Sequence, residues 1–397
     1  MEILNIDRRW FFVILSLFIV SCDKYPPVNA NFNGSETAIL VGGHVAFTDL
    51  SGGEPELWNW TFEGGTPLTS DQHNPVVTYL SAGKYNVRLE ASNPGHTDSE
   101  LKADFIEVYG EIHGAFTAND TVIDQGSQVI FTDASMGAPS SWEWTFEGGN
   151  PTTSTTQNQT VIYSQPGLYN VTLKVSNKLS SETLIKSDLV AVLPTSGLIA
   201  YYPFNGNAID ESTESHDATV YNATLTTDRH GVVNKAYMFN GLSDYINTNS
   251  TFDLETRSVS LWIRPDDING YNTTAHVAFT QDAPELTYGI WRVDVEVGYL
   301  NLWAGGTSGT YSTPGQQGKW CHIVMVRTAN ETRYYINGSF LFAGVPSGLS
   351  STWGPNNILI IGAGRSTIDQ FFKGKIDDIR IYDRSLSPDE IAALFKE

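Results

Sequence analysis

Apolar and polar residues alternate along most of this chain, which predicts short β-strands. Tyr85, Val87 and Leu89 alternate with polar neighbours, and residues 291–297 follow the same pattern. A period of two residues is typical of strands that bury one face. Residues 387–395 differ, because a Ser-Pro-Asp-Glu capping sequence is followed by apolar positions three and four residues apart. We therefore expect an all-β protein with one short helix near its C-terminus.

The first half of the chain contains a tandem duplication. Residues 58–65 read Trp-Asn-Trp-Thr-Phe-Glu-Gly-Gly, and residues 142–149, 84 positions later, read Trp-Glu-Trp-Thr-Phe-Glu-Gly-Gly. A Tyr-Asn-Val motif recurs at the same offset. Repetition at a fixed period indicates one folding unit that is present twice. With short strands and Gly-Gly turns, each unit predicts a small β-sandwich of the immunoglobulin type, at 28–109 and 112–193.

The two units resemble the PKD (polycystic kidney disease) domain family. That family carries Trp-x-Phe-Gly-Asp-Gly and Gly-x-Tyr-x-Val, and this chain has Trp-Thr-Phe-Glu-Gly-Gly at 60–65 and Gly-Lys-Tyr-Asn-Val at 83–87. The change to Glu-Gly-Gly alters the turn but keeps the Trp and the Phe. Two tryptophans on one strand face also fit sugar stacking, yet we interpret them as core residues. The resemblance implies that both domains act as spacers.

A short linker that contains Pro, Ser and Gly ends the repeat, and strand patterns continue through residues 197–397. This part is similar to the LamG-like jellyroll family, a concanavalin A-like β-sandwich. The motifs that carry the similarity occur in order, at 198–212, 236–241, 258–263, 318–324, 335–338 and 374–387. The resemblance implies one jellyroll sandwich after two immunoglobulin-like sandwiches. It identifies no ligand, because one fold hosts many functions.

The chain is acidic, with 44 Asp and Glu residues against 23 Lys and Arg residues and a formal net charge of −21. Binding to nucleic acid requires clustered basic side chains, so we expect no nucleic-acid partner. The same charge opposes adsorption to anionic lipid headgroups. Neutral ligands and calcium ions are compatible with it.

The N-terminal residues resemble the signal of a bacterial lipoprotein. Two arginines precede an apolar run at 10–20, which is too short to span a bilayer as a helix. The run leads to Phe-Ile-Val-Ser-Cys22, which is similar to a lipobox with Ile in place of the usual Leu. We expect residues 1–21 to be removed, Cys22 to be lipidated and residues 22–27 to form a short tether. The alternative is a plain secretory signal. A lipid anchor would place the protein in the cell envelope, on the outer membrane and exposed at the surface.

The sequence contains no evident catalytic constellation. Glycoside hydrolases with this sandwich carry Glu-x-Asp-x-x-Glu on one strand, whereas Asp294 and Glu296 lack the third acid. Cys321 precedes His322 in a strand-like run, and adjacent strand residues point to opposite faces, so we interpret the thiol as buried and inert. The eight histidines lack metal-ligand spacing. We therefore expect no enzyme activity.

A structural calcium ion is implied by the jellyroll resemblance. The family often holds one near its N-terminal Asn/Asp loop and the Asp pair of its last strand, which here are Asn205, Asp210, Asp377 and Asp378. These residues offer the oxygen ligands that calcium prefers. Because Asp377 and Asp378 are adjacent on one strand and should point to opposite faces, we expect at most one of them to be a ligand and the other to pair with a neighbour such as Arg380. The alternative is an acidic rim without metal.

Carbohydrate binding calls for exposed aromatic rings beside amides and carboxylates. Among the aromatic residues outside the family's core motifs, we select as candidates Tyr271, Tyr288, Trp291, Trp303, Tyr311 and Trp353. Each of these residue types is more often part of a core than of a ligand site. We expect one or two of the six to be exposed.

The leading hypothesis is a surface lipoprotein that captures a polysaccharide or a glycoprotein through the jellyroll domain. It would resemble the accessory binding proteins of polysaccharide uptake systems in Bacteroidetes-type bacteria. The alternative is a protein-binding adhesin or a structural envelope protein. A glycoside hydrolase is the third reading.

Overall fold

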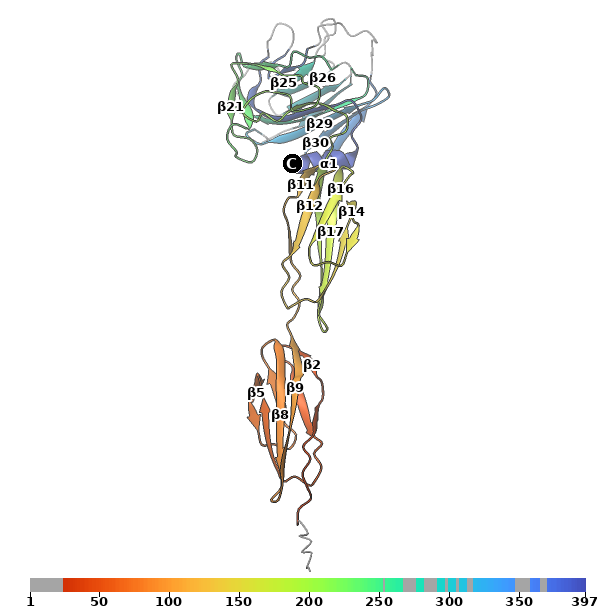
Figure 1. Ribbon diagram of the computed structural model, residues 1–397. Coiled ribbons are helices and arrows are strands. Elements are labelled where there is room, and N and C mark those ends of the chain that lie inside the picture. Colours follow the sequence, from red (N-terminus) through yellow and green to blue (C-terminus); the bar gives the residue numbers. More distant parts are fainter. Residues whose placement is uncertain are drawn as a thin grey trace, which may run out of the picture. The chain divides into compact units, whose positions relative to one another are not determined.

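The computed structural model describes residues 24–252, 254–266, 276–281, 291–296, 299–304, 307–312, 317–346, 358–364 and 370–397. These residues form β-strands and one short helix (Figure 1), which confirms the predicted all-β fold. Within the described ranges, no helix is long and apolar enough to cross a membrane. The predicted signal and Cys22 lie outside the described residues.

The first domain is a sandwich of two sheets. Its strands are β1 (Phe32–Gly34), β2 (Ala38–Leu40), β3 (His44–Asp49), β4 (Leu57–Phe62), β5 (Gly65–Thr66), β6 (Thr69–Ser70), β7 (Val76–Tyr79), β8 (Gly83–Ser92) and β9 (Thr97–Tyr109). One sheet has the order β1-β3-β7-β5 and the other β2-β9-β8-β4-β6. Strands β2 and β9 pair in parallel, with Ile39 opposite Val108.

Alternation along β4 places its aromatic side chains in the core of this sandwich. Trp60 and Phe62 are fully buried, and their rings stack with centroids 5.7 Å apart. Phe32 meets Trp60 edge to face at 5.2 Å. Trp58 is half-buried, and its indole Nε1 donates to the Asp49 carboxylate at 2.9 Å. The prediction that the Trp pair packs in the core is therefore confirmed for Trp60.

The second domain repeats the first. Its strands are β10 (Phe116–Ala118), β11 (Val122–Asp124), β12 (Gln128–Asp133), β13 (Ser141–Phe146), β14 (Gly149–Asn150), β15 (Thr153–Ser154), β16 (Gln159–Tyr163), β17 (Gly167–Ser176) and β18 (Ser181–Leu193). The sheet orders, β10-β12-β16-β14 and β11-β18-β17-β13-β15, match those of the first domain strand for strand. Trp144 is buried where the first domain buries Trp60.

The third domain is a larger sandwich of an eight-stranded and a seven-stranded sheet. Its elements are β19 (Leu198–Tyr202), β20 (Thr219–Tyr221), β21 (Thr224–Thr226), β22 (Ala236–Asn240), β23 (Tyr245–Asn247), β24 (Arg257–Pro265), β25 (His276–Gln281), β26 (Trp291–Glu296), β27 (Tyr299–Ala304), β28 (Thr307–Ser312), β29 (Cys321–Arg327), β30 (Thr332–Ile336), β31 (Ser339–Gly344), β32 (Ile360–Ile361), β33 (Lys373–Tyr382) and α1 (Pro388–Lys396).

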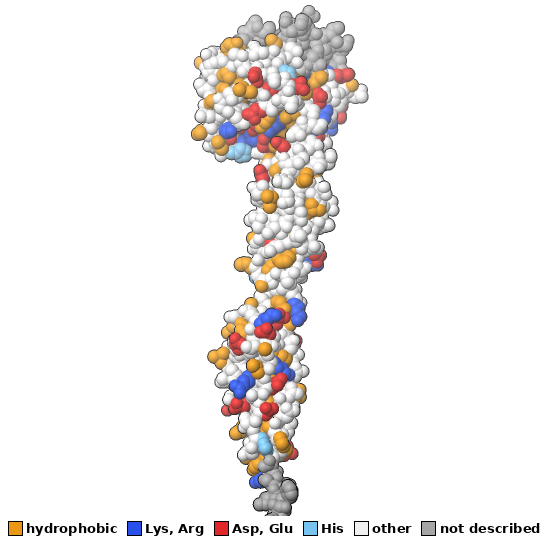
Figure 2. Space-filling model, in the orientation of Figure 1, with side chains coloured by type: hydrophobic (Ala, Val, Ile, Leu, Met, Phe, Trp, Pro, Cys, Tyr) orange, Lys and Arg blue, Asp and Glu red, His pale blue; other side chains and the backbone are white. Residues whose placement is uncertain are grey.

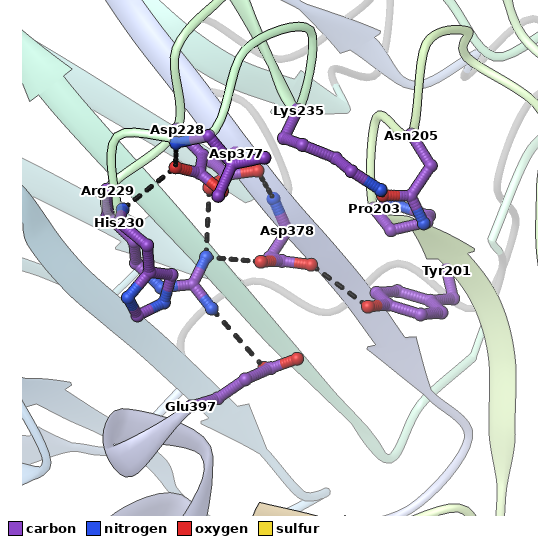
Figure 3. Close-up of a pocket in the computed structure, with 11 residues that line it drawn as sticks. Tyr201, Pro203, Asn205, Asp228, Arg229, His230, Lys235, Asp377, Asp378 and Glu397 are labelled. Atoms are coloured by element: carbon purple, nitrogen blue, oxygen red, sulfur yellow. Dashed lines mark hydrogen bonds and ion pairs between the residues drawn. The ribbon is translucent and has the colours of Figure 1, made fainter.

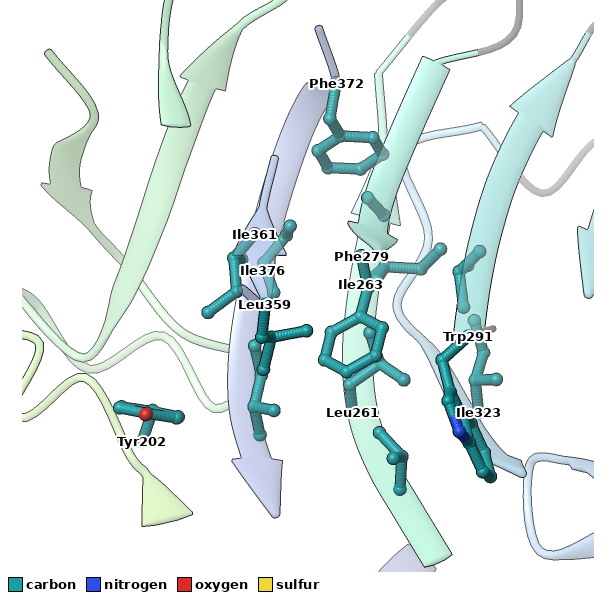
Figure 4. Close-up of a cluster of buried hydrophobic side chains, with 14 of the residues drawn as sticks. Tyr202, Leu261, Ile263, Phe279, Trp291, Ile323, Leu359, Ile361, Phe372 and Ile376 are labelled. Carbon is teal, nitrogen blue, oxygen red and sulfur yellow. The ribbon is translucent and has the colours of Figure 1, made fainter. Parts of the chain in front are cut away.

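The two sheets of this domain follow different orders. The eight-stranded sheet has the order β21-β22-β33-β24-β29-β30-β31, and β19 also pairs with β33. The seven-stranded sheet has the order β20-β23-β32-β25-β26-β27-β28. Between them lies a core of alternating inward residues, among which Figure 4 shows Leu261 and Ile323 from one sheet and Phe279 and Trp291 from the other.

Helix α1 begins with the predicted capping box. The Ser387 hydroxyl accepts from the Glu390 N–H at 3.3 Å, and the Ser387 N–H donates to the Glu390 carboxylate at 2.7 Å. Ile391 and Leu394 are buried in a cluster with residues of β29, β30 and β33, and this cluster also contains Leu193 at the end of β18. All of these residues belong to one compact unit of the chain.

Charged side chains of both signs are interspersed on the face of the third domain shown in Figure 2. The first domain also shows both signs on this face, whereas the second domain shows few charges. The net charge of −21 is therefore not gathered into one large acidic patch on the visible face.

Candidate functional site

The outer face of the seven-stranded sheet carries polar and aromatic side chains in cross-strand register. Along β26, Trp291, Val293 and Val295 belong to the core, so Arg292 and Asp294 between them face outward. On the neighbouring β27, Asn301 lies opposite Asp294.

The next pairs extend this row across the sheet. Trp303 of β27 lies opposite Arg292, and Thr310 of β28 lies opposite Asn301. We call these five residues, Arg292, Asp294, Asn301, Trp303 and Thr310, the outer-face cluster.

Hydrogen bonds fix the orientation of the cluster. The Arg292 Nε donates to the Asp294 carboxylate at 2.5 Å, and an Arg292 Nη donates to the Gln370 amide oxygen at 2.8 Å. The Thr310 hydroxyl donates to the Asn301 amide oxygen at 2.9 Å. Such pre-oriented carboxylate, amide and hydroxyl groups beside an indole ring offer both the hydrogen bonds and the flat apolar surface that a neutral polar ligand needs.

The cluster is more open toward β27 and β28 than toward the middle of the sheet. Asp294 is buried, whereas Asn301 and Trp303 are half-buried and Thr310 is exposed. Tyr299, which begins β27, is 48% exposed on the same face. Any ligand on this face therefore meets these residues of β27 and β28 first.

Two predicted ligand residues take core positions instead. Trp291 is buried in the centre of the sandwich (Figure 4), and the Arg257 guanidinium lies 4.4 Å from its ring centroid. Tyr311 is half-buried and packs against the same core, because it points inward opposite Leu300. Period-two alternation assigns both positions to the inner face, so neither is among the one or two exposed aromatic residues that we expected.

Of the six predicted aromatic residues, only Trp303 lies on the outer face among those that the structure describes. Tyr271, Tyr288 and Trp353 are outside the described residues. The sequence analysis did not select Tyr221 and Tyr245, whose rings stack at 4.4 Å on facing positions of β20 and β23. Ile246 is in the core, so its neighbour Tyr245 points outward. The alternation around Ile246 is the signal that would have identified this pair.

A second polar site lies beside β33, which is an inner strand of the eight-stranded sheet. It is a pocket of about 270 Å³ lined by Tyr201, Pro203, Asn205, Asp228, Arg229, His230, Val232, Lys235, Asp377, Asp378 and Glu397. Figure 3 shows the Arg229 guanidinium between the carboxylates of Asp377, Asp378 and Glu397. We call this group the Arg229 cluster. Three of the four predicted calcium ligands line the pocket, and the fourth, Asp210, does not.

Both carboxylates of the Asp377–Asp378 pair reach the same guanidinium, which corrects the expectation that they face opposite sides. The pairing of β24 with β33 shifts register between Ser260 and Trp262, and Asp378 has a positive φ of 39°. This is a β-bulge, which inserts one extra residue and turns a side chain to the other face. Arg229 Nη1 donates to Asp377 Oδ2 at 2.9 Å and also to Asp378 Oδ2.

The four predicted ligands do not form the oxygen cage that calcium requires. Asp210 accepts the backbone N–H groups of Tyr201, Ser212 and His216, each at 2.8 Å, so it organises its own loop. The Asn205 amide oxygen accepts from Lys235 Nζ at 2.6 Å. Within the described parts of the chain, no three His, Cys, Asp or Glu side chains are grouped to hold a metal ion.

Burial changes the protonation of groups beside this pocket. Burial and the neighbouring charge of Asp378 raise the pKa of Asp377 well above its usual range. Burial, together with the charges of Arg229 and Arg380, lowers the pKa of His322 to about 3. His322 shares a hydrogen bond with the Ser260 hydroxyl at 2.8 Å. Both shifts favour neutral forms, as expected for buried groups.

Cys321 and His322 point to opposite sides of β29, as predicted. Cys321 belongs to the core between the sheets, where burial raises the pKa of its thiol to about 12. His322 stacks instead against Trp262 on the other side, with ring centroids 4.8 Å apart. The thiol and the imidazole therefore do not form a nucleophile and base pair.

The family comparisons match three regions of the chain with two domain models. The PKD domain model matches residues 29–104 and 115–187, and the model of the concanavalin A-like lectin/glucanases superfamily matches residues 239–392. Together, these domain types indicate a binding function toward carbohydrate or protein.

Two human proteins share sequence with short parts of the chain. Polycystin-1 is 31% identical over 120 residues, which cover 30% of this chain and 3% of that protein. Adhesion G-protein coupled receptor D1 is 34% identical over 89 residues, which cover 22% of this chain and 10% of that protein. The chain thus spans only a small part of these relatives.

Several solved structures are similar to about half of the chain. Domain 4 of AbnA, an extracellular arabinanase from Geobacillus stearothermophilus in complex with arabinotriose, covers 50% of this chain and 97% of its own length, with 23% identity and a TM-score of 0.40. The botulinum neurotoxin serotype D binding domain covers 51% of each chain, with 18% identity and a TM-score of 0.41.

Proposed function

We propose that this chain, which consists of two PKD domains and a concanavalin A-like domain, captures polysaccharide on the outer face of its seven-stranded sheet. The observation that carries the proposal is the outer-face cluster, in which Asp294, Asn301 and Thr310 stand in cross-strand register beside the indole of Trp303. Sugar hydroxyls both donate and accept hydrogen bonds, and carboxylate, amide and hydroxyl groups complement them. The apolar face of a sugar ring packs on an indole.

The proposal is one of binding rather than hydrolysis. Retaining glycosidases hold two carboxyl groups about 5–5.5 Å apart, one protonated as an acid and one free as a nucleophile. On β26 the Asp294 carboxylate is instead bound by the Arg292 guanidinium, and Glu296 is exposed at the end of the strand. A carboxylate bound by an arginine and an exposed carboxylate two residues along the strand do not form such a pair of acid and nucleophile.

We also propose that the protein is held at the outer surface of the cell by lipidated Cys22. An acylated cysteine would tether the two PKD domains and leave the third domain to meet polymers outside the membrane. Several acyl chains on one cysteine suffice for stable attachment, since each buried methylene contributes about 0.8 kcal/mol. Radiolabelled palmitate that fails to enter the protein in cells, while a known lipoprotein in the same cells is labelled, would contradict this part.

The binding proposal is tested with the full chain on affinity gels that contain soluble polysaccharides, followed by titration with oligosaccharides of the retained one. We expect retention on at least one polysaccharide. Trp303→Ala and Asn301→Ala should each weaken binding about tenfold or more, which corresponds to at least about 1.4 kcal/mol. No retention on any polysaccharide overturns the proposal, and release of reducing sugar overturns the exclusion of hydrolysis.

The matched control is Phe340→Ala, which removes an aromatic ring that is 58% exposed on β31 of the other sheet. Its retention should equal that of the unchanged protein. Equal binding by the control and by Trp303→Ala would place the ligand away from the outer-face cluster. Melting curves of all variants separate loss of binding from loss of fold.

A further inference from the structure

The Arg229 cluster holds a buried cation among three acids. The Arg229 side chain is 7% exposed, and that of Asp377 is 2% exposed. Arg229 Nη1 donates to both Asp377 and Asp378, and Arg229 Nη2 lies 3.8 Å from Glu397 Oε2. Its guanidinium also lies over the Trp262 ring, with Cζ 4.8 Å from the centroid. The Arg229 side chain thus contacts the β-bulge of β33, the residue Glu397 that follows helix α1, and the Trp262 ring of β24.

The β-bulge in β33 brings two carboxyl groups close together. It turns two adjacent carboxyl groups to one side, where like charges within a few ångströms repel and little water screens them. A buried charge is tolerated when a partner neutralises it and satisfies its hydrogen-bonding atoms. A cation between the two carboxyl groups therefore stabilises this corner.

The loop that carries Arg229 holds its guanidinium in a fixed position. The Asp228 carboxylate accepts the backbone N–H groups of His230 at 2.9 Å and Val232 at 2.7 Å, which closes the turn around Arg229. Lys375 Nζ donates to the carbonyl oxygen of Thr227 at 3.1 Å and to its hydroxyl at 2.7 Å, which ties the loop to β33. An arginine held in this way is charged at every relevant pH and needs no free ion.

Glu397 connects the same corner to a second arginine. Both of its carboxylate oxygens accept from Arg380, each at 2.5 Å, and Arg380 stacks over the Tyr201 ring at 4.0 Å. The Tyr201 hydroxyl in turn donates to Asp378 at 3.0 Å. These contacts form a closed ring that links β19, β33 and the end of α1. Its members are Arg229, Asp378, Tyr201, Arg380 and Glu397.

We infer that the Arg229 guanidinium takes the place of a structural metal ion at this corner, so that the jellyroll holds its last strand and its helix without calcium. A calcium ion would require oxygen ligands at about 2.3–2.6 Å in the space between the carboxyl groups. The Arg229 guanidinium already occupies that space. The inference concerns stability and does not depend on carbohydrate binding.

The first test is the thermal unfolding of the full chain with 5 mM EDTA and with 5 mM CaCl2. The transition that reports the jellyroll is the one lowered by Arg229→Ala. We expect the unchanged protein to unfold at the same temperature in both solutions. A lower transition temperature with EDTA, or a higher one with calcium, overturns the inference.

The second test restores the missing cation. Arg229→Ala should lower the transition, and millimolar guanidinium or calcium should raise it again, because a ligand bound only by the folded state stabilises it. The control Arg384→Ala removes a guanidinium that faces the single carboxylate of Glu390 at 2.6 Å, and it should show no rescue. A folded Arg229→Ala variant that neither cation stabilises more than this control contradicts the inference.

A third variant decides the case if Arg229→Ala does not fold. Arg229→Lys keeps a positive charge on the same loop, so it should fold with a lowered transition that calcium leaves unchanged. A calcium-dependent rise in this variant would mean that the carboxyl groups prefer a metal ion to a fixed side-chain cation, and it would overturn the inference.

Discussion

Asp377 and Asp378 are neighbours in strand β33, yet both carboxyl groups face the same side of the sheet and contact the same guanidinium. The left-handed φ of Asp378 and the register shift opposite Ser260 and Trp262 produce this arrangement. The two residues are not equivalent, because Asp377 is the more buried and its pKa is raised, which favours its neutral form near pH 7.

We therefore predict different costs for the two amide substitutions. Asp377→Asn replaces a carboxyl whose neutral form is favoured with a neutral group of the same shape, but the amide keeps only one of the two acceptor oxygens, so it should cost about 0.5–1.5 kcal/mol. Asp378→Asn removes a charged acceptor of Arg229 and Tyr201 and should cost about 1.5–3 kcal/mol. Urea unfolding of both variants at pH 7 measures the difference. Equal losses, or a larger loss for Asp377→Asn, would show that the neutral form is assigned to the wrong residue.

A second prediction concerns the glycines of the first domain. Gly64 and Gly42 both have positive φ, at 65° and 85°, so alanine is strained at either position. A Cβ at Gly64 would lie 2.1 Å from Cε1 of Tyr85, whereas a Cβ at Gly42 meets nothing within 4 Å. Gly42→Ala should cost about 1–2 kcal/mol, and Gly64→Ala roughly 1–3 kcal/mol more.

Guanidinium unfolding of the full chain measures these losses, and the second domain supplies an independent repeat. A Cβ at Gly148 would likewise lie 2.1 Å from Cε1 of Tyr169, and a Cβ at Gly126 meets nothing within 4 Å. Gly148→Ala should again lose more than Gly126→Ala. Equal losses within each pair would mean that the tyrosine ring moves aside freely.

The third prediction is a pH dependence that arises from His322. Its pKa in the folded protein is lowered to about 3, below the value of about 6.5 in an unfolded chain. Between these values the unfolded chain binds a proton that the folded protein excludes, so this contribution to stability is present above pH 6.5 and is lost as the pH falls toward 3. The slope should be about 1.4 kcal/mol per pH unit.

His322→Gln should remove this slope while it keeps a group that can bond to Ser260. The measurement is the free energy of unfolding of both proteins between pH 4 and 7, from which the difference in slope is taken. Parallel curves would show that His322 is protonated in the folded state. Other groups that titrate in this range affect both proteins alike and cancel in the comparison.

The fourth prediction concerns thiol reactivity. Cys321 is 7% exposed and its pKa is raised to about 12, so its reactive thiolate is scarce at neutral pH. Iodoacetamide at pH 8 should leave Cys321 unmodified in the folded protein and label it fully in denaturant. Peptide mass spectrometry separates Cys321 from Cys22. Rapid labelling in the folded state would contradict the burial of this side chain.

The repeat and the alternation of residues made most of the fold predictable. Two copies of Trp-x-Trp-x-Phe at one offset predicted two equal domains, and both bury the second tryptophan, Trp60 or Trp144. The capping box of Ser387 and Glu390 was predictable because its hydrogen bonds are local. Local patterns of this kind depend on few tertiary contacts.

The candidate sites were harder to predict because they depend on contacts distant in sequence. Nothing near Asp377 indicates that Arg229, 148 residues earlier, neutralises it. The bulge did leave a signal, since the core residues Ile376 and Ile379 are three positions apart rather than two. That spacing places both intervening aspartates on the outer face, and it outweighs strict alternation.

The parallel pairing of β2 with β9, and of β11 with β18, has a mechanical consequence for each PKD domain. β2 lies near the N-terminal end of the first domain and β9 is its last strand, and β11 and β18 have the same places in the second domain. Tension applied through the chain pulls these two strands past each other along their length. Their hydrogen bonds are then loaded in shear and must break together, whereas bonds pulled from one end break one at a time.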